Sequence, residues 1–176
     1  MHTSFLNKLN EYKMEVGSDI QQRLTDELLS GLASSLLNDS VFEICRTLRE
    51  VQHLEEKNLF SSRVKMVNEQ VVSKQEVISK HREKIQSCLS EPENLQAVQA
   101  QCEKEAKEFD LKCEDELKKK DMRIIMELDQ KVMDQQVTLE KLGIPGFYVT
   151  NKEIEMQVQM CLLEFILKLQ NSQEND

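Results

Sequence analysis

The chain lacks tryptophan, and its 176 residues include only two prolines, four glycines and 5% aromatic residues. A compact globular domain of this length usually builds its core around bulky aromatic side chains. With 31% charged residues, such a core is disfavoured. Proline and glycine interrupt helices, and both are absent over long stretches. The composition therefore predicts long helices whose 39% hydrophobic residues form seams between them.

An excess of positive charge is also missing. The formal net charge is -9, with a pI near 5.0. A phosphate-binding surface needs clustered Lys and Arg. The run Lys118-Lys119-Lys120 is bordered by acidic residues and is typical of a solvated helix face. We expect no nucleic-acid partner.

The patterns that mark catalytic or metal sites are not found either. The five cysteines include no Cys-x-x-Cys pair, and the three histidines are not spaced as metal ligands. There is no Gly-rich phosphate loop and no G-x-S-x-G motif. We therefore expect no metal, no cofactor, no catalytic residue and no small-molecule substrate, which means a protein that is not an enzyme.

A signal segment and a membrane-spanning run are both lacking. The longest apolar stretch, residues 160–169, is interrupted by Glu164 and Lys168. An odd number of cysteines does not suit a disulfide framework. These observations predict a soluble intracellular protein.

Apolar spacing predicts helices over residues 5–16 and 18–37, so that residues 1–39 form N-terminal helices that pack on the rest. A capping box at Ser40–Glu43 begins a long arm that meets no Gly or Pro before Pro92. Its second part has a strict three-four spacing: Phe60, Val64, Val67, Val71, Lys74, Ile78, His81, Ile85 and Cys88. This pattern is typical of a coiled-coil seam.

A turn near residues 90–93 separates this arm from a second one of similar length, which ends at Gly143. The apolar positions of the second arm are Leu95, Val98, Cys102, Ala106, Phe109, Cys113, Leu117, Lys120 and Ile124. The fold class predicted is all-α, a long antiparallel coiled-coil hairpin over residues 40–142 with a small helical bundle at its open end. A parallel dimer of one continuous rod is the alternative. If His81 is buried on the seam, acid pH should loosen the hairpin.

Residues 143–150 form an apolar island, Gly143-Ile-Pro-Gly-Phe-Tyr-Val-Thr150, between long charged helices. Residues 143–170 are expected to be this loop and a last helix, with Thr150 and Glu153 as a capping box; residues 171–176 are expected to be a disordered tail. Phe147, Tyr148 and Phe165 are candidate anchors for a protein partner, because aromatic side chains dominate many interfaces. Packing in the core is the alternative for each.

Four groups of residues resemble a known family. The longest is residues 128–141, which runs on into Gly146–Thr150; residues 41–44, residues 51–57, and residues 162–164 with 168–170 agree as well. These stretches resemble the gonadal protein family, which includes the DiGeorge syndrome critical region proteins. The resemblance implies a small helical coiled-coil protein without known enzyme activity, with roles in gonad and in cell migration during development. It also implies residence in the nucleus, with the cytoplasm as the alternative.

The sequence thus predicts a non-enzymatic adaptor that binds a protein partner of unknown identity. The alternative is a structural coiled-coil spacer built from several copies, of which a homodimer is the simplest.

Overall fold

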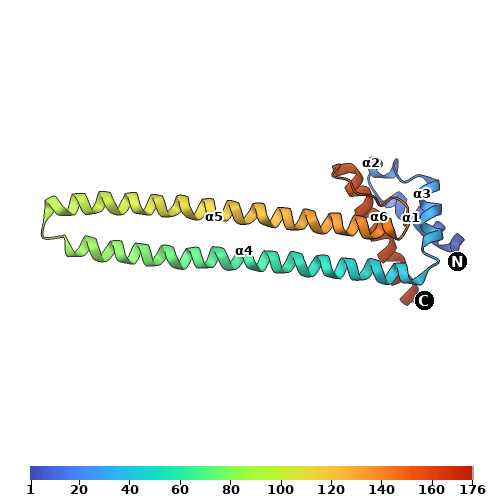
Figure 1. Cartoon of the computed structure of the whole chain (residues 1–176), viewed down its shortest axis with the longest axis horizontal. Helices are drawn as coiled ribbons and strands as arrows, with labels where there is room; N and C mark the ends of the chain where they lie inside the picture. The colour runs from blue at the N-terminus through green and yellow to red at the C-terminus, as the bar shows by residue number, and fades with distance from the viewer. Residues whose placement is uncertain (176) are drawn as a thin grey trace. The chain divides into compact units, whose positions relative to one another are not determined.

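The computed structural model describes residues 1–175, which contain helices and no strand. The helices are α1 (His2–Glu15), α2 (Ser18–Gln21), α3 (Asp26–Ser35), α4 (Asp39–Ser87), α5 (Pro92–Lys141) and α6 (Glu153–Glu174), as Figure 1 shows. The predicted all-α class is confirmed.

The chain divides into two compact units. One, which we call the core unit, consists of residues 1–54 and the chain from Asp129 onward; the other, the two-helix unit, is Glu55–Leu128. Both boundaries fall inside the predicted hairpin of residues 40–142, so α4 and α5 each contribute to both units.

The core unit is held together by apolar side chains from α1, α3, α6, the start of α4 and the end of α5. Phe5 and Phe42 meet edge to face with ring centroids 5.9 Å apart, and Tyr12 and Phe165 lie 5.6 Å apart. Burying one such side chain fully contributes about 1.5–3 kcal/mol. The largest side chains that are completely buried are Leu9, Leu24, Leu29, Leu32, Leu36, Leu139, Leu162, Ile166, Leu169 and Cys45.

The predicted helix over residues 18–37 is in fact two helices, α2 and α3. Thr25 ends the first segment, because its hydroxyl oxygen accepts a hydrogen bond from the Leu28 amide at 3.2 Å and so caps α3. Gly17 precedes α2, and no side chain caps this helix. The start of α4 is close to the predicted one, with the Asn38 side chain accepting from the Ser40 amide at 3.1 Å.

The last helix also differs at its ends. It starts at Glu153 after an uncapped Lys152, so Thr150 and Glu153 do not form the predicted capping box. Instead, the Thr150 hydroxyl donates to Glu155 and accepts from the Lys152 amide. Where the sequence predicts disorder from residue 171, α6 continues to Glu174, with the Ser172 hydroxyl donating to the Lys168 carbonyl at 2.9 Å. Asp176 lies outside the described residues.

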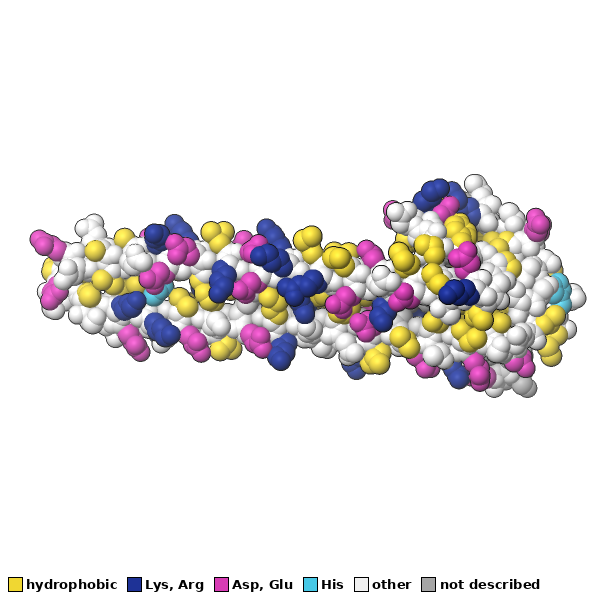
Figure 2. All heavy atoms as spheres, in the orientation of Figure 1, with side chains coloured by type: hydrophobic (Ala, Val, Ile, Leu, Met, Phe, Trp, Pro, Cys, Tyr) yellow, Lys and Arg dark blue, Asp and Glu magenta, His cyan; other side chains and the backbone are white. Residues whose placement is uncertain are grey.

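In the two-helix unit, α4 and α5 run antiparallel. Rising positions on α4 pair with falling positions on α5: Arg63 with Asp121 at 2.7 Å, Lys74 with Asp110, and His81 with Glu105 at 2.9 Å. Figure 2 shows Lys and Arg interspersed with Asp and Glu along this part of the surface. The exposed ion pairs contribute little each, so they fix register more than stability.

The predicted seam of the second arm agrees with the burial in this unit at every position, whereas that of the first arm agrees at five of its nine positions. On α5, the predicted positions are half-buried, and Cys102 is fully buried. On α4, four predicted seam residues are exposed: Phe60, Val64, Val71 and Ile78. The other five predicted positions are half-buried: Val67, Lys74, His81, Ile85 and Cys88. Leu59, Met66, Gln70 and Val77 are half-buried as well, and the Gln70 side chain donates to the Cys113 carbonyl at 3.1 Å.

Within residues 1–175, no helix is both long and apolar enough to span a membrane.

Candidate functional site

The apolar island is the loop that joins α5 to α6 in the core unit. Two glycines with positive φ shape it, Gly143 at 73° and Gly146 at 86°. The amides of Gly143 and Ile144 donate to the carbonyls of Glu140 and Leu139, which closes the end of α5. This part of the prediction, a glycine cap after the second arm, agrees with the structure.

The loop is clamped between α3 and α6. A Cβ atom on Gly146 would lie 2.6 Å from a methyl carbon of Leu162 on α6 and 3.1 Å from one of Leu28 on α3. On the other side, a Cβ on Gly31 of α3 would lie 3.1 Å from the Pro145 ring. At Gly146 the loop therefore approaches α6 at a distance that favours glycine, and its positive φ does so as well.

A pair of buried glutamines fixes the next residues of the loop. The Gln136 amide nitrogen donates to the Gln159 side-chain oxygen at 2.9 Å and to the Thr150 carbonyl at 3.1 Å, and the Thr150 amide donates back to Gln136 at 3.3 Å. Gln159 in turn donates to the Tyr148 carbonyl at 2.9 Å. Buried amides without partners are costly, so this network holds residues 148–150 in one conformation.

Sequence reasoning missed these two glutamines. Gln159 lies within the broad apolar face of α6, between Val158 and Cys161, and both neighbours are buried. A polar residue inside such a face is a signal for a buried hydrogen-bonded site. Its partner, Gln136, lies 23 residues earlier in the chain, and the spacing of residues along one helix does not predict such a contact.

The three candidate anchors have different positions. Phe147 and Phe165 lie in the hydrophobic core, and Phe165 packs against Tyr12. Tyr148 is 43% exposed and the adjacent Val149 is 48% exposed. We call Tyr148 and Val149 the loop platform, since both are open to solvent on a loop that is fixed from within.

A charged cluster lies beside the loop platform. Partial burial, followed by the Glu155 carboxylate, raises the pKa of Tyr148. The Thr150 hydroxyl, as hydrogen-bond donor, lowers the pKa of Glu155, and Lys152 lies 3.8 Å from that carboxylate. The tyrosine therefore stays neutral at physiological pH, as an aromatic anchor requires.

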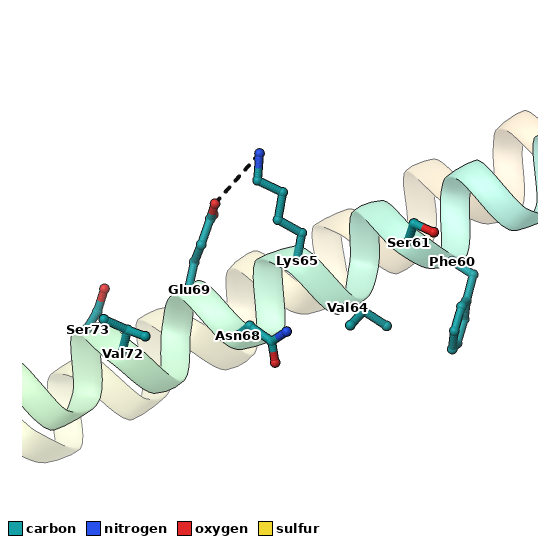
Figure 3. Close-up of a pocket in the computed structure, with 8 residues that line it drawn as sticks. All are labelled: Phe60, Ser61, Val64, Lys65, Asn68, Glu69, Val72 and Ser73. Atoms are coloured by element: carbon teal, nitrogen blue, oxygen red, sulfur yellow. Dashed lines mark ion pairs between the residues drawn. The ribbon is translucent and has the colours of Figure 1, made fainter.

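Chemistry of other kinds finds little support in the described residues. Residues 1–175 contain no group of three or more His, Cys, Asp or Glu placed to hold a metal ion. Burial raises the pKa of Cys45 to about 12 and that of Cys161 to about 11, which makes both poor nucleophiles. A groove runs along α4, and its eight lining residues all come from that one helix (Figure 3).

Comparison with known proteins identifies the family. The model of the DiGeorge syndrome critical region 6 (DGCR6) protein family matches residues 1–176. The chain belongs to the DGCR6 family. It is similar to the protein DGCR6 of Gallus gallus, with 44% identity over 98% of this chain and 85% of that protein. It is also similar to the gonadal protein gdl of Drosophila melanogaster, with 37% identity over 93% of this chain and 77% of that protein.

No solved structure matches this DGCR6-family chain. The geometry of its loop and helices therefore has to be interpreted from its own residues. The resemblance inferred from residues 128–150 and the shorter stretches is confirmed by the family match.

Proposed function

We propose that this DGCR6-family chain is a non-enzymatic adaptor that binds a protein partner through the loop platform. The observation that supports this is the combination of exposure and rigidity at Tyr148 and Val149. Both side chains face solvent, yet the backbone that carries them is held by the Gln136–Gln159 pair. A backbone that is already fixed loses little conformational entropy on binding, so a small contact yields more affinity.

The long helices supply the second part of the proposal. We propose that α4 and α5 pair along their whole length as one antiparallel coiled-coil hairpin. The cross-helix pairs of the two-helix unit, from Arg63–Asp121 to His81–Glu105, support this arrangement. In the core unit, the ends of both helices contribute to one apolar core, through Phe42 of α4 and Leu139 of α5.

The biological setting is proposed from the family. The name of the Drosophila relative refers to the gonad, and we propose a developmental role for this chain. We further propose an intracellular location, supported by five unpaired cysteines; the nucleus is the compartment that the resemblance implies and the cytoplasm is the alternative. Imaging of the tagged full chain in cells decides between them.

Proximity labelling in cells, with and without changes at the loop platform, tests the adaptor function. The variant carries Tyr148→Ala and Val149→Ser. Loss of particular labelled proteins, with an unchanged thermal melting curve, supports the proposal. Labelling that does not change contradicts it.

Two matched controls accompany this variant. Met160→Ala truncates a side chain that is also exposed, on α6, and should leave labelling unchanged. Phe147→Ala removes a core side chain and should lower stability by about 3–5 kcal/mol. If the double variant instead melts like Phe147→Ala, Tyr148 and Val149 serve the fold and the proposal is wrong.

The alternative function is a structural spacer in which arms of separate copies pair in place of the hairpin. It requires an elongated oligomer at every concentration. The antiparallel pairs within one chain, such as Lys74 with Asp110, support the adaptor over the spacer. Light scattering over a range of concentrations separates the two, since a monomer at low concentration is incompatible with the spacer.

A further inference from the structure

The strict heptad pattern of α4 is only partly used inside the chain. Nine positions from Phe60 to Cys88 keep the three-four spacing without a break. Four of these side chains are left open to solvent: Phe60 at 67%, Val64 at 39%, Val71 at 50% and Ile78 at 44% exposed. We call these four residues the α4 stripe.

The α4 stripe lies beside the face that α5 covers. At 100° per residue, Phe60, Val71 and Ile78 fall within about 20° of one another, and Leu59, Gln70 and Val77 lie about 100° away. The latter three are half-buried, and Gln70 bonds to α5. Val71 and Ile78 border hollows that they share with α5, Val71 beside Phe109 and Ile78 beside Cys102. The stripe is therefore covered by α5 only in part, and the rest of it is open to solvent.

The flank of the stripe away from α5 carries almost no charge. At the positions that border it, Ser61, Asn68 and Gln75 are uncharged. The acidic residues Glu69 and Glu76 lie on a different side of the helix. Figure 3 shows Phe60 and Val64 pointing to one side of α4, while Lys65 and Glu69 form an ion pair on another side. A neutral flank allows the face to meet a copy of itself without repulsion between like charges.

We propose that the α4 stripe binds the α4 stripe of a second copy of this chain, in antiparallel orientation. In this register, Phe60 faces Ile78 of the second copy and Val67 faces Val71 of the second copy. Both contacts then occur twice, as a two-fold interface requires.

Lys74 decides the orientation. A parallel pair in register would place Lys74 against Lys74 of the second copy on the seam, with like charges opposed. In the antiparallel pair, Lys74 faces Val64 of the second copy. Its ammonium group is already directed to α5, where it pairs with Asp110 and lies 5.8 Å from the centre of the Phe109 ring.

The size of the stripe sets its strength. From Phe60 to Ile78 the helix rises about 28 Å, and a contact about 10 Å wide gives roughly 280 Å² for each copy. The total of roughly 560 Å² is below the ~1,200 Å² of stable complexes, so the dimer is weak and depends on concentration.

Analytical ultracentrifugation of the full chain tests the proposal. The weight-average mass should rise from the monomer value of 20.5 kDa toward twice that value as concentration increases from about 10 µM to about 1 mM. Val71→Lys should raise the dissociation constant at least about tenfold. Leu111→Lys is the matched control: Leu111 is 65% exposed but lies on α5, so its change should leave association unaltered.

The antiparallel register has its own test. Phe60→Glu and Ile78→Lys should each weaken self-association, and mixing the two variants should restore it, because the new charges then face each other. A parallel pair would not be restored, since Phe60 would face Phe60. Helical circular dichroism of every variant verifies that each is folded.

Three results overturn the proposal. The first is a wild-type chain that stays monomeric at about 1 mM, which leaves the stripe to a helix of another protein. The second is equal weakening by Leu111→Lys and Val71→Lys. The third is a mixture of Phe60→Glu and Ile78→Lys that does not associate more tightly than either variant alone.

Discussion

Replacing glycines one at a time tests whether the loop between α5 and α6 organises the core unit. Three glycines differ in backbone φ and in the room left for a Cβ atom: Gly146, Gly143 and Gly17. Comparing them separates the cost of backbone strain from the cost of a steric clash. Gly146 has a φ of 86° and no room for a Cβ; Gly143 has a φ of 73° and open space around it. Gly17 has a φ of -61°, and a Cβ added there would likewise meet nothing within 4 Å.

The expected destabilisation follows this order. A left-handed φ costs an alanine about 1–2 kcal/mol. An extra carbon 2.6 Å from Leu162 forces a shift in a packed core, which adds about 1–3 kcal/mol. We therefore expect losses of about 2–5 kcal/mol for Gly146→Ala and about 1–2 kcal/mol for Gly143→Ala. For Gly17→Ala the change should be close to zero, because lower entropy of the unfolded chain offsets a slightly poorer helix cap.

Tyrosine fluorescence during urea unfolding is the suitable assay. The chain has no tryptophan, and its two tyrosines, Tyr12 and Tyr148, both lie in the core unit. Fluorescence therefore reports on that unit, whereas helical circular dichroism reports on both. If Gly146→Ala is no more destabilising than Gly143→Ala, the close approach to Leu162 and Leu28 does not constrain the loop.

Three further predictions concern buried or paired side chains. Gln136→Leu should lower the stability of the core unit by about 1–3 kcal/mol in the same urea assay, because its amide partner on α6 and the loop backbone lose their hydrogen bonds; an unchanged midpoint would contradict this. Lowering the pH from about 7.5 to about 5.5 should leave the helical melting temperature unchanged, because the lowered pKa of Glu105 keeps its carboxylate ionised over this range, whereas a lower melting temperature would favour the sequence-based hypothesis of acid loosening. Hydrogen bonds, first from Gln101 and then from His81, lower the pKa of Glu105. The Glu105 carboxylate therefore stabilises the fold at any pH above its ordinary pKa, and this stabilisation is lost only as the pH falls through the lowered pKa of the folded chain. Cys45 and Cys161, with pKa values raised by burial to about 12 and about 11, should resist iodoacetamide at neutral pH until the chain unfolds, as mass spectrometry can follow.

The two long helices show how far periodicity can predict structure. On α5, apolar residues occupy mainly one face of the two-helix unit, so the predicted positions from Leu95 to Ile124 agree with the buried ones. On α4, apolar residues occupy two neighbouring faces. The regular three-four series is only partly covered by α5: Lys74 and His81 pair with residues of α5, whereas Phe60 and Ile78 are exposed. Spacing alone cannot tell which of two apolar faces has its partner in the same chain.

For the loop between α5 and α6, the sequence indicates the location but not the detail. Composition distinguishes residues 143–150 from their surroundings, and glycine chemistry explains their turn. The alternation between buried Phe147 and exposed Tyr148 depends on contacts with α3 and α6 that local sequence does not specify. The Gln136–Gln159 pair joins two helices across a loop, and such a hydrogen bond leaves no periodic signal.

The two proposed surfaces lie in different units of the chain, which allows them to be tested independently. The loop platform belongs to the core unit and the α4 stripe to the two-helix unit. Changes at sites that share no contacts usually have additive effects. We therefore expect Tyr148→Ala to leave the dissociation constant of the dimer unchanged, and Val71→Lys to leave the set of labelled proteins unchanged. If Val71→Lys also removes the labelled proteins, partner binding requires the dimer. The adaptor would then bind through two copies of the loop platform at once, and such bivalent binding raises avidity without new contacts.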